Sequence, residues 1–209
     1  MSEHLLIKGF IIGFSIAAPV GPIGVLCIRR TLINGRLAGL LSGLGAATAD
    51  AVYGAIAGFG LTVIAGFLLR QQIWLSLGGG LFLCFLGLKT VLKQPNERLT
   101  STESSEGLGG AYASTFLLTL TNPATILAFV AIFAGLGVAN GTRNYASATL
   151  VVLGVFAGSA LWWLVLSGSV SLLRSRLTPD RLRWVNRLSG IAITTFGLFI
   201  LMSLGTSIK

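Results

Sequence analysis

The chain has 209 residues, of which 54% are hydrophobic and only 10% are charged, and its mean hydropathy is +0.86. A soluble domain needs about 25% charged residues to cover its surface, so a soluble globular domain and a disordered chain are both excluded. The net charge is +9, but the charges lie between long apolar runs rather than on one solvated face, which argues against nucleic acid as a partner. Composition therefore predicts an all-α, multi-pass membrane protein surrounded by a lipid bilayer.

Six apolar runs predict six transmembrane helices, since a helical span needs about 20 apolar residues. In chain order these runs are residues 9–28, 37–69, 73–88, 107–142, 144–173 and 188–208. The third run is short, but Lys89 can snorkel, so its helix is expected to continue to about residue 92. The end of the first run, Ser15 to Ala18, resembles a signal-peptide cleavage region. However, Glu3 offsets the only early lysine, Lys8, and this favours a retained span over a cleaved leader.

One hydrophilic segment, residues 93–107, divides the chain into two groups of three predicted spans. Its Ser, Thr and charged residues show no apolar period, which is typical of a flexible linker. The chain is therefore interpreted as a single membrane transporter domain over 1–209, with a first repeat at 5–92, a cytoplasmic linker at 93–107 and a second repeat at 108–208. No water-soluble part is large enough to hold an enzyme.

The two halves share a spacing of distinctive residues. Pro22 lies 101 residues before Pro123, and three further residues recur after 110 positions: Trp74 as Trp184, Gly80 as Gly190 and Gly87 as Gly197. Because three is an odd number of spans, the second copy must be inverted relative to the first, an arrangement typical of secondary transporters. The alternative is coincidence within a low-complexity apolar sequence.

Positive charge predicts the orientation of the chain. Eleven of the 15 Lys and Arg residues follow the first, third and fifth predicted helices, and four lie on the other side. The larger set is Arg29, Arg30, Arg36, Lys89, Lys93, Arg98, Arg174, Arg176, Arg181, Arg183 and Arg187, and the smaller is Lys8, Arg70, Arg143 and Lys209. The larger set should be cytoplasmic, which places both termini outside the cytoplasm.

Asp50 is the only acidic residue within a predicted span. A charge near the bilayer centre costs about 2.5–3.5 kcal/mol on insertion scales, so it normally faces the protein interior. Small residues share its helical face: Gly43, Ala47, Gly54 and Gly58. Asp50 is therefore expected on a helix-packing face, with Tyr53 one turn away as its hydrogen-bond partner. It would bind a substrate amine or a proton, or else make a structural contact between helices.

Prolines predict a break in the first helix of each half. Pro19, Gly21 and Pro22 interrupt the first span, because proline removes a backbone donor and glycine allows a sharp turn. Asn122 and Pro123 occupy the equivalent place in the second half, where Asn122 can cap the following half-helix. The free N–H groups of such half-helices would suit a carboxylate, and the paired breaks indicate a site between the halves.

Other chemistry is poorly supported. Cys27 and Cys84 lie in different spans without CxxC spacing, which argues against a thiol-disulfide carrier. His4 has no metal-ligand companions, so no metal and no cofactor are expected. The small-residue faces would suit packing within one chain or between two, which leaves a homo-oligomer open.

Two segments carry a family resemblance: Ala18 to Gly24 with Arg30-Thr31-Leu32 and the stretch up to Asp50, and later Leu120 to Pro123. In combination these motifs resemble the lysine exporter (LysE/RhtB) family of bacterial amino-acid efflux proteins. The resemblance implies proton-driven export of amino acids or related small metabolites across the inner membrane. It also implies that Pro19, Gly21, Pro22, Asp50, Asn122 and Pro123 occupy characteristic positions. One departure is Pro-Val-Gly-Pro in place of the usual Pro-Gly-Pro.

The sequence thus predicts a secondary exporter of a small-molecule substrate, coupled to protons. The alternative within transport is a metal or inorganic-ion exporter, which normally needs several carboxylate, His or Cys ligands in the spans.

Overall fold

The computed structural model describes residues 2–19, 21–59, 67, 70–92, 107–122, 124–129, 145–174 and 178–207, and all regular secondary structure in these ranges is helical. The helices are α1 (Ser2–Ala17), α2 (Pro22–Asn34), α3 (Arg36–Gly58), α5 (Gln72–Leu92), α6 (Leu108–Leu120), α8 (Tyr145–Arg174) and α9 (Pro179–Ser207), with a further helical segment at 124–129. The prediction of an all-α protein is confirmed.

Four helical segments of the described chain are long and apolar enough to cross a membrane: α3, α5, α8 and residues Arg183–Leu204 of α9. A fifth span forms if α1 and α2 are counted together, although the two helices are bent by 80° at the break between them. α6 is apolar but shorter. The protein is therefore a multi-pass helical membrane protein.

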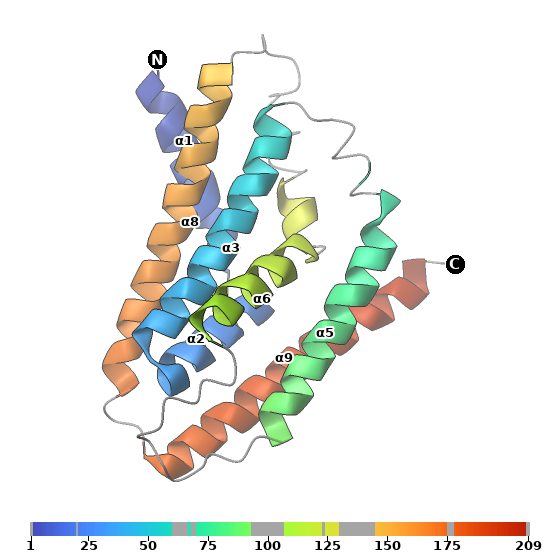
Figure 1. Ribbon diagram of the computed structural model, residues 1–209. Coiled ribbons are helices and arrows are strands. Elements are labelled where there is room, and N and C mark those ends of the chain that lie inside the picture. The colour runs from blue at the N-terminus through green and yellow to red at the C-terminus, as the bar shows by residue number, and fades with distance from the viewer. Residues whose placement is uncertain are drawn as a thin grey trace.

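The central helix of the bundle is α3, which packs against α8 on one side and α6 on another (Figure 1). α1 packs along α8, while α5 and α9 pair with each other. The short helix α2 contacts α3, α8 and α9, so it joins the α5–α9 pair to the rest of the bundle. Buried polar groups between these helices must bind one another, because lipid offers no hydrogen-bond partners.

A single residue, Gly35, connects α2 to α3. Its φ of 98° with ψ of 168° lies in a region that is essentially restricted to glycine. Its N–H donates to the carbonyl oxygen of Thr31 over 3.2 Å and so ends α2. This turn lets α3 begin at Arg36 and return along the bundle.

The first predicted span differs from the structure at its C-terminal end. Arg29 and Arg30 were expected in a loop, but both lie inside α2. The helix starts afresh at Pro22 and continues to Asn34, because its polar residues find partners on neighbouring helices. Six of the other nine cations in the larger set also lie inside helices: Arg36, Lys89, Arg174, Arg181, Arg183 and Arg187.

Other helix ends also differ from the apolar runs. The helix in the run 37–69 ends at Gly58, and the run 107–142 is interrupted after Leu120. The last helix begins at Pro179 rather than at residue 188 and so includes Arg183 and Arg187. These ends depend on backbone breaks and caps rather than on hydrophobicity. The linker, apart from Gly107, and Pro123 lie outside the described residues.

Candidate functional site

Asp50 lies on the face of α3 that packs against α8. Its side chain is only 3% exposed, and its Oδ2 accepts a hydrogen bond of 2.7 Å from the hydroxyl of Ser159 in the middle of α8. On the same face, Gly54 and Gly58 also face α8. A Cβ on Gly54 would lie 3.5 Å from Val155, and a Cβ on Gly58 would lie 3.7 Å from Ala148. The predicted helix-packing face is therefore confirmed, because small residues let α8 approach the carboxylate closely.

Tyr53 has a different partner from the one expected. Its hydroxyl donates to the backbone carbonyl of Leu120 over 2.5 Å, so the predicted hydrogen bond to Asp50 was wrong. The physical reason is that α6 ends at Leu120, and the last carbonyls of a helix lack partners within the helix. Tyr53 thus links α3 to the second helix break, with its ring stacked on Phe129.

The first helix break lies where the prolines predicted it. α1 ends at Ala17, and α2 begins with Pro22 at its first position after Gly21. The N–H of Gly21 donates to the carbonyl of Pro19 over 3.0 Å, which closes the turn. Gly21 provides no side-chain cap, so the first N–H groups of α2 have no acceptor from that residue.

The second break has the predicted cap. The side-chain oxygen of Asn122 accepts a hydrogen bond of 3.2 Å from the N–H of Ala124, and its backbone carbonyl accepts from Thr125 and Ile126. This is the pattern of an N-cap residue, which satisfies donors at the start of a helix. The prediction that Asn122 caps a half-helix is confirmed.

One pocket brings the two breaks together. It is lined from four helices and the second break by Pro22, Ile23, Gly79, Leu83, Leu118, Thr121, Asn122 and Ile200. Pro22 starts α2 and Asn122 caps the helical segment at 124–129, so residues about 100 positions apart share one hollow. Asp50 and Tyr53 do not line it.

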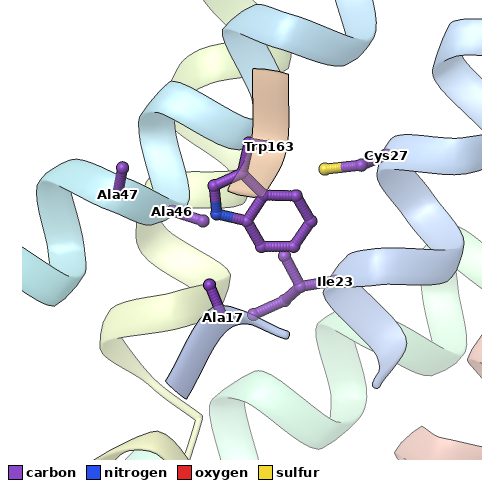
Figure 2. Close-up of a cluster of buried hydrophobic side chains, with 6 residues drawn as sticks. All are labelled: Ala17, Ile23, Cys27, Ala46, Ala47 and Trp163. Carbon is purple, nitrogen blue, oxygen red and sulfur yellow. The ribbon is translucent and has the colours of Figure 1, made fainter. Parts of the chain in front are cut away.

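A cluster centred on Trp163 lies beside this pocket (Figure 2). The indole of α8 packs with Ala17 at the end of α1, Ile23 and Cys27 of α2, and two alanines of α3. Ile23 belongs both to this cluster and to the pocket lining. The pocket and the cluster therefore share one side chain.

Arg30 is a buried residue whose role could not be derived from its position in the sequence. It is 4% exposed, and its guanidinium donates to the hydroxyls of Ser42, Ser114 and Thr115 and to the carbonyl of Ala111, over 2.8–3.0 Å. These partners belong to α3 and α6, so Arg30 fastens the first half-helix to the second half of the chain. Only the hydroxyl-rich face of α6 could have indicated this contact.

Metal and thiol chemistry find little support in the described part of the chain. No group of three or more His, Cys, Asp or Glu residues there could hold a metal ion. Cys27 and Cys84 are both free thiols and lie on different helices, α2 and α5.

Together, the apolar helices, the paired breaks and the buried carboxylate define a multi-pass membrane protein whose spans are interrupted where they meet. The sequence model of the LysE type translocator family matches residues 14–204, and the chain belongs to this family. Its members are transporters rather than enzymes, which confirms both the resemblance and the prediction that the chain is not an enzyme.

Relatives match along most of their length. YcgF of Bacillus subtilis, which is named as an amino acid efflux protein, is 26% identical over 94% of each chain. The threonine efflux protein of Salmonella typhi is 24% identical over 88% of this chain and 90% of its own. The chemotactic transduction protein ChpE of Pseudomonas aeruginosa is 25% identical over 81% of this chain and 84% of its own. No solved structure matches the chain.

Proposed function

We propose that this protein is a secondary active exporter of amino acids or related small metabolites in the bacterial inner membrane, driven by the proton gradient. The observation that carries the proposal is that two broken helices, one from each half of the chain, line one pocket. Interrupted helices that meet between two halves are typical of the substrate sites of secondary transporters. The amino acid efflux named in two relatives supports the substrate class.

The proposed architecture is two inverted three-helix repeats. A Cβ on Gly45 of α3 would overlap the carbonyl oxygen of Tyr112 in α6, and a Cβ on Gly154 of α8 would overlap that of Leu6 in α1. In both cases the next close atom is the amide nitrogen four residues later. The first helix of each half thus packs on the middle helix of the other half through the same kind of contact.

The α5–α9 pair shows the same reciprocity. A Cβ on Gly80 would lie 3.3 Å from the carbonyl of Gly197, and a Cβ on Gly87 would lie 2.8 Å from that of Gly190. Gly80 and Gly190 are counterparts 110 residues apart, and so are Gly87 and Gly197. The counterpart of the Gly80–Gly197 contact is therefore the contact between Gly190 and Gly87. This relation is expected for two inverted copies related by a two-fold axis, so it supports the repeat.

In the proposed mechanism, the start of α2 would bind the substrate carboxylate through N–H groups that Gly21 does not cap. At the second break Asn122 caps the N–H groups itself, so it would offer its side-chain amide to the substrate. Asp50 would bind the ammonium group, or take up a proton on one side and release it on the other. The pocket lies between the α5–α9 pair and the remaining helices. Rocking of these two parts would expose it to each side of the membrane in turn.

Efflux from cells preloaded with a mixed dipeptide panel tests the proposal, with threonine among the products because one relative is named for it. Expression should raise amino acid export, and an uncoupler should abolish the increase. Asp50→Asn should reduce export to the level of cells without the protein, because Asn retains the shape but cannot carry charge or a titrating proton. Glu3→Gln, at the exposed start of α1, is the matched control and should export normally.

Two results would contradict the proposal. Normal export by Asp50→Asn would remove Asp50 from the mechanism, and export that persists with the uncoupler would exclude proton coupling. The alternative of a metal or inorganic-ion exporter is not favoured by the comparisons. It would be supported only if expression raised metal efflux and left every amino acid unchanged.

A further inference from the structure

One buried donor lacks a hydrogen-bond partner in the described part of the chain: the indole nitrogen of Trp163. Trp163 is only 4% exposed, so bulk solvent does not reach this N–H. A buried indole N–H usually finds an acceptor, and inside a membrane each unsatisfied polar group is expensive. This donor is therefore expected to bind an acceptor that is not part of the described protein.

Trp163 lies one helical turn from the Asp50–Ser159 hydrogen bond. On α8, Trp163 follows Ser159 by four residues, and on α3, Ala46 precedes Asp50 by four residues. Ala46 packs against the indole, while Ser159 donates to the Asp50 carboxylate. The indole and the carboxylate thus come from neighbouring layers of one interface, whose backbone positions are about 6 Å apart along the helices.

The wall beside the indole nitrogen is built of small side chains at the first helix break. Figure 2 shows the nitrogen on the side of Ala46 and Ala17, away from Cys27. Ala17 is the last residue of α1 before the break, and Ala46 belongs to α3. A movement of the break could therefore open space beside the N–H without displacing a large side chain.

Ile23 connects this position to the pocket between the two breaks. The same side chain packs in the Trp163 cluster and lines the pocket. A solute that widened this small pocket would thus be one side chain away from Trp163. The Asp50–Ser159 pair lies one helical turn beyond Trp163.

From this placement we infer that Trp163 is a substrate-binding residue, whose N–H donates to the carboxylate of an amino acid while Asp50 receives the ammonium group. The inference rests on the proposed function and deepens it. An amino acid carries a carboxylate and an ammonium group on one carbon atom, so a neutral donor and a carboxylate within about one helical turn match both of its charges. A structural tryptophan would need no such neighbour.

The test compares Trp163→Phe with Trp162→Phe in proteoliposomes, using threonine as the transported solute. Trp163→Phe keeps an aromatic side chain but removes the donor, and should raise the KM for threonine about tenfold without lowering the maximal rate. Trp162, whose ring meets the edge of Phe14, is the matched control and should leave KM unchanged. An unchanged KM in Trp163→Phe would overturn the assignment.

Competition with 1-aminopropan-2-ol, which is threonine without its carboxylate, identifies the group that is recognised. Wild-type protein should prefer threonine over this amine, and Trp163→Phe should lose most of the preference. Equal preference in both proteins would show that Trp163 does not bind the carboxylate. If the wild type exports no amino acid, the proposed function fails; if it does and Trp163→Phe behaves like it, only this inference fails.

Fluorescence keeps the inference testable if Trp163→Phe does not fold. The chain has four tryptophans, and replacing Trp74, Trp162 and Trp184 by Phe leaves Trp163 as the only strong emitter. Saturating threonine should shift the emission maximum of Trp163. Emission that is unaffected by threonine, in a protein that still transports it, would contradict direct contact.

Discussion

At the residue scale, the Asp50 carboxylate has one hydrogen-bond partner among the described residues, Ser159. Ser159 donates a hydrogen bond of 2.7 Å to the carboxylate from the opposite helix. A hydroxyl can donate to a carboxylate and can also accept from a carboxylic acid. Ser159 can therefore partner Asp50 in both protonation states, which is what the proposed proton carrier requires.

Replacing Ser159 by Ala should reduce export while the protein still folds. The change removes the donor from a buried carboxylate and is expected to cost about 1–3 kcal/mol. Export per mole of purified protein, measured in proteoliposomes, is the readout. Ser167→Ala is the control, because Ser167 lies on the same helix, is also buried, and its described hydrogen bond goes to Leu164 of its own helix. If both variants export equally well, Ser159 is not needed for transport.

At the element scale, the pairing of α5 with α9 depends on glycine. The two backbones approach so closely that a Cβ on Gly87 would overlap the hydroxyl of Thr194 and lie 2.8 Å from the carbonyl of Gly190. Small residues permit such packing in membranes, where no hydrophobic force drives helices together. In the proposed rocking mechanism, the pair would therefore move as one unit.

Gly87→Ala should lower the melting temperature of the purified protein in detergent. Overpacking of this kind costs about 1–3 kcal/mol. Gly78 lies on the same helix, and a Cβ there would meet no atom within 4 Å. Gly78→Ala should leave the melting temperature unchanged or raise it, because Ala is favoured over Gly in a helix by about 1 kcal/mol. A loss of stability in Gly78→Ala as large as in Gly87→Ala would contradict the packing argument.

At the scale of the whole molecule, positive charges gather at one end. The turn between α2 and α3, the end of α5 and the end of α8 lie together, opposite the start of α1 (Figure 1). These regions include Arg36, Lys89 and Arg174. The positive-inside rule then predicts that this end faces the cytoplasm and that both termini lie outside it.

Reporter fusions test this orientation. Alkaline phosphatase, which is active only outside the cytoplasm, should be active when fused after Lys209 and inactive when inserted in the linker at 93–107. A fluorescent protein that matures only in the cytoplasm should show the reverse pattern. Cytoplasmic fluorescence from the Lys209 fusion would overturn the predicted topology.

The sequence by itself determined the features that depend on local chemistry. Proline removes a backbone donor wherever it occurs, so the break before Pro22 and the cap at Asn122 could be predicted without a structure. The small-residue face around Asp50 followed from helical periodicity alone. The membrane class followed from composition, because so few charges cannot cover a surface in water.

Only the tertiary structure decided which residues meet. The contact of Tyr53 with Leu120, the Asp50–Ser159 hydrogen bond and the burial of Arg30 against α6 all join segments at least 67 residues apart. No local pattern specifies such partners, since they depend on how helices pack and on which groups are left unsatisfied. The indole N–H of Trp163 could be recognised for the same reason, because only the folded chain shows that no described group accepts a hydrogen bond from it.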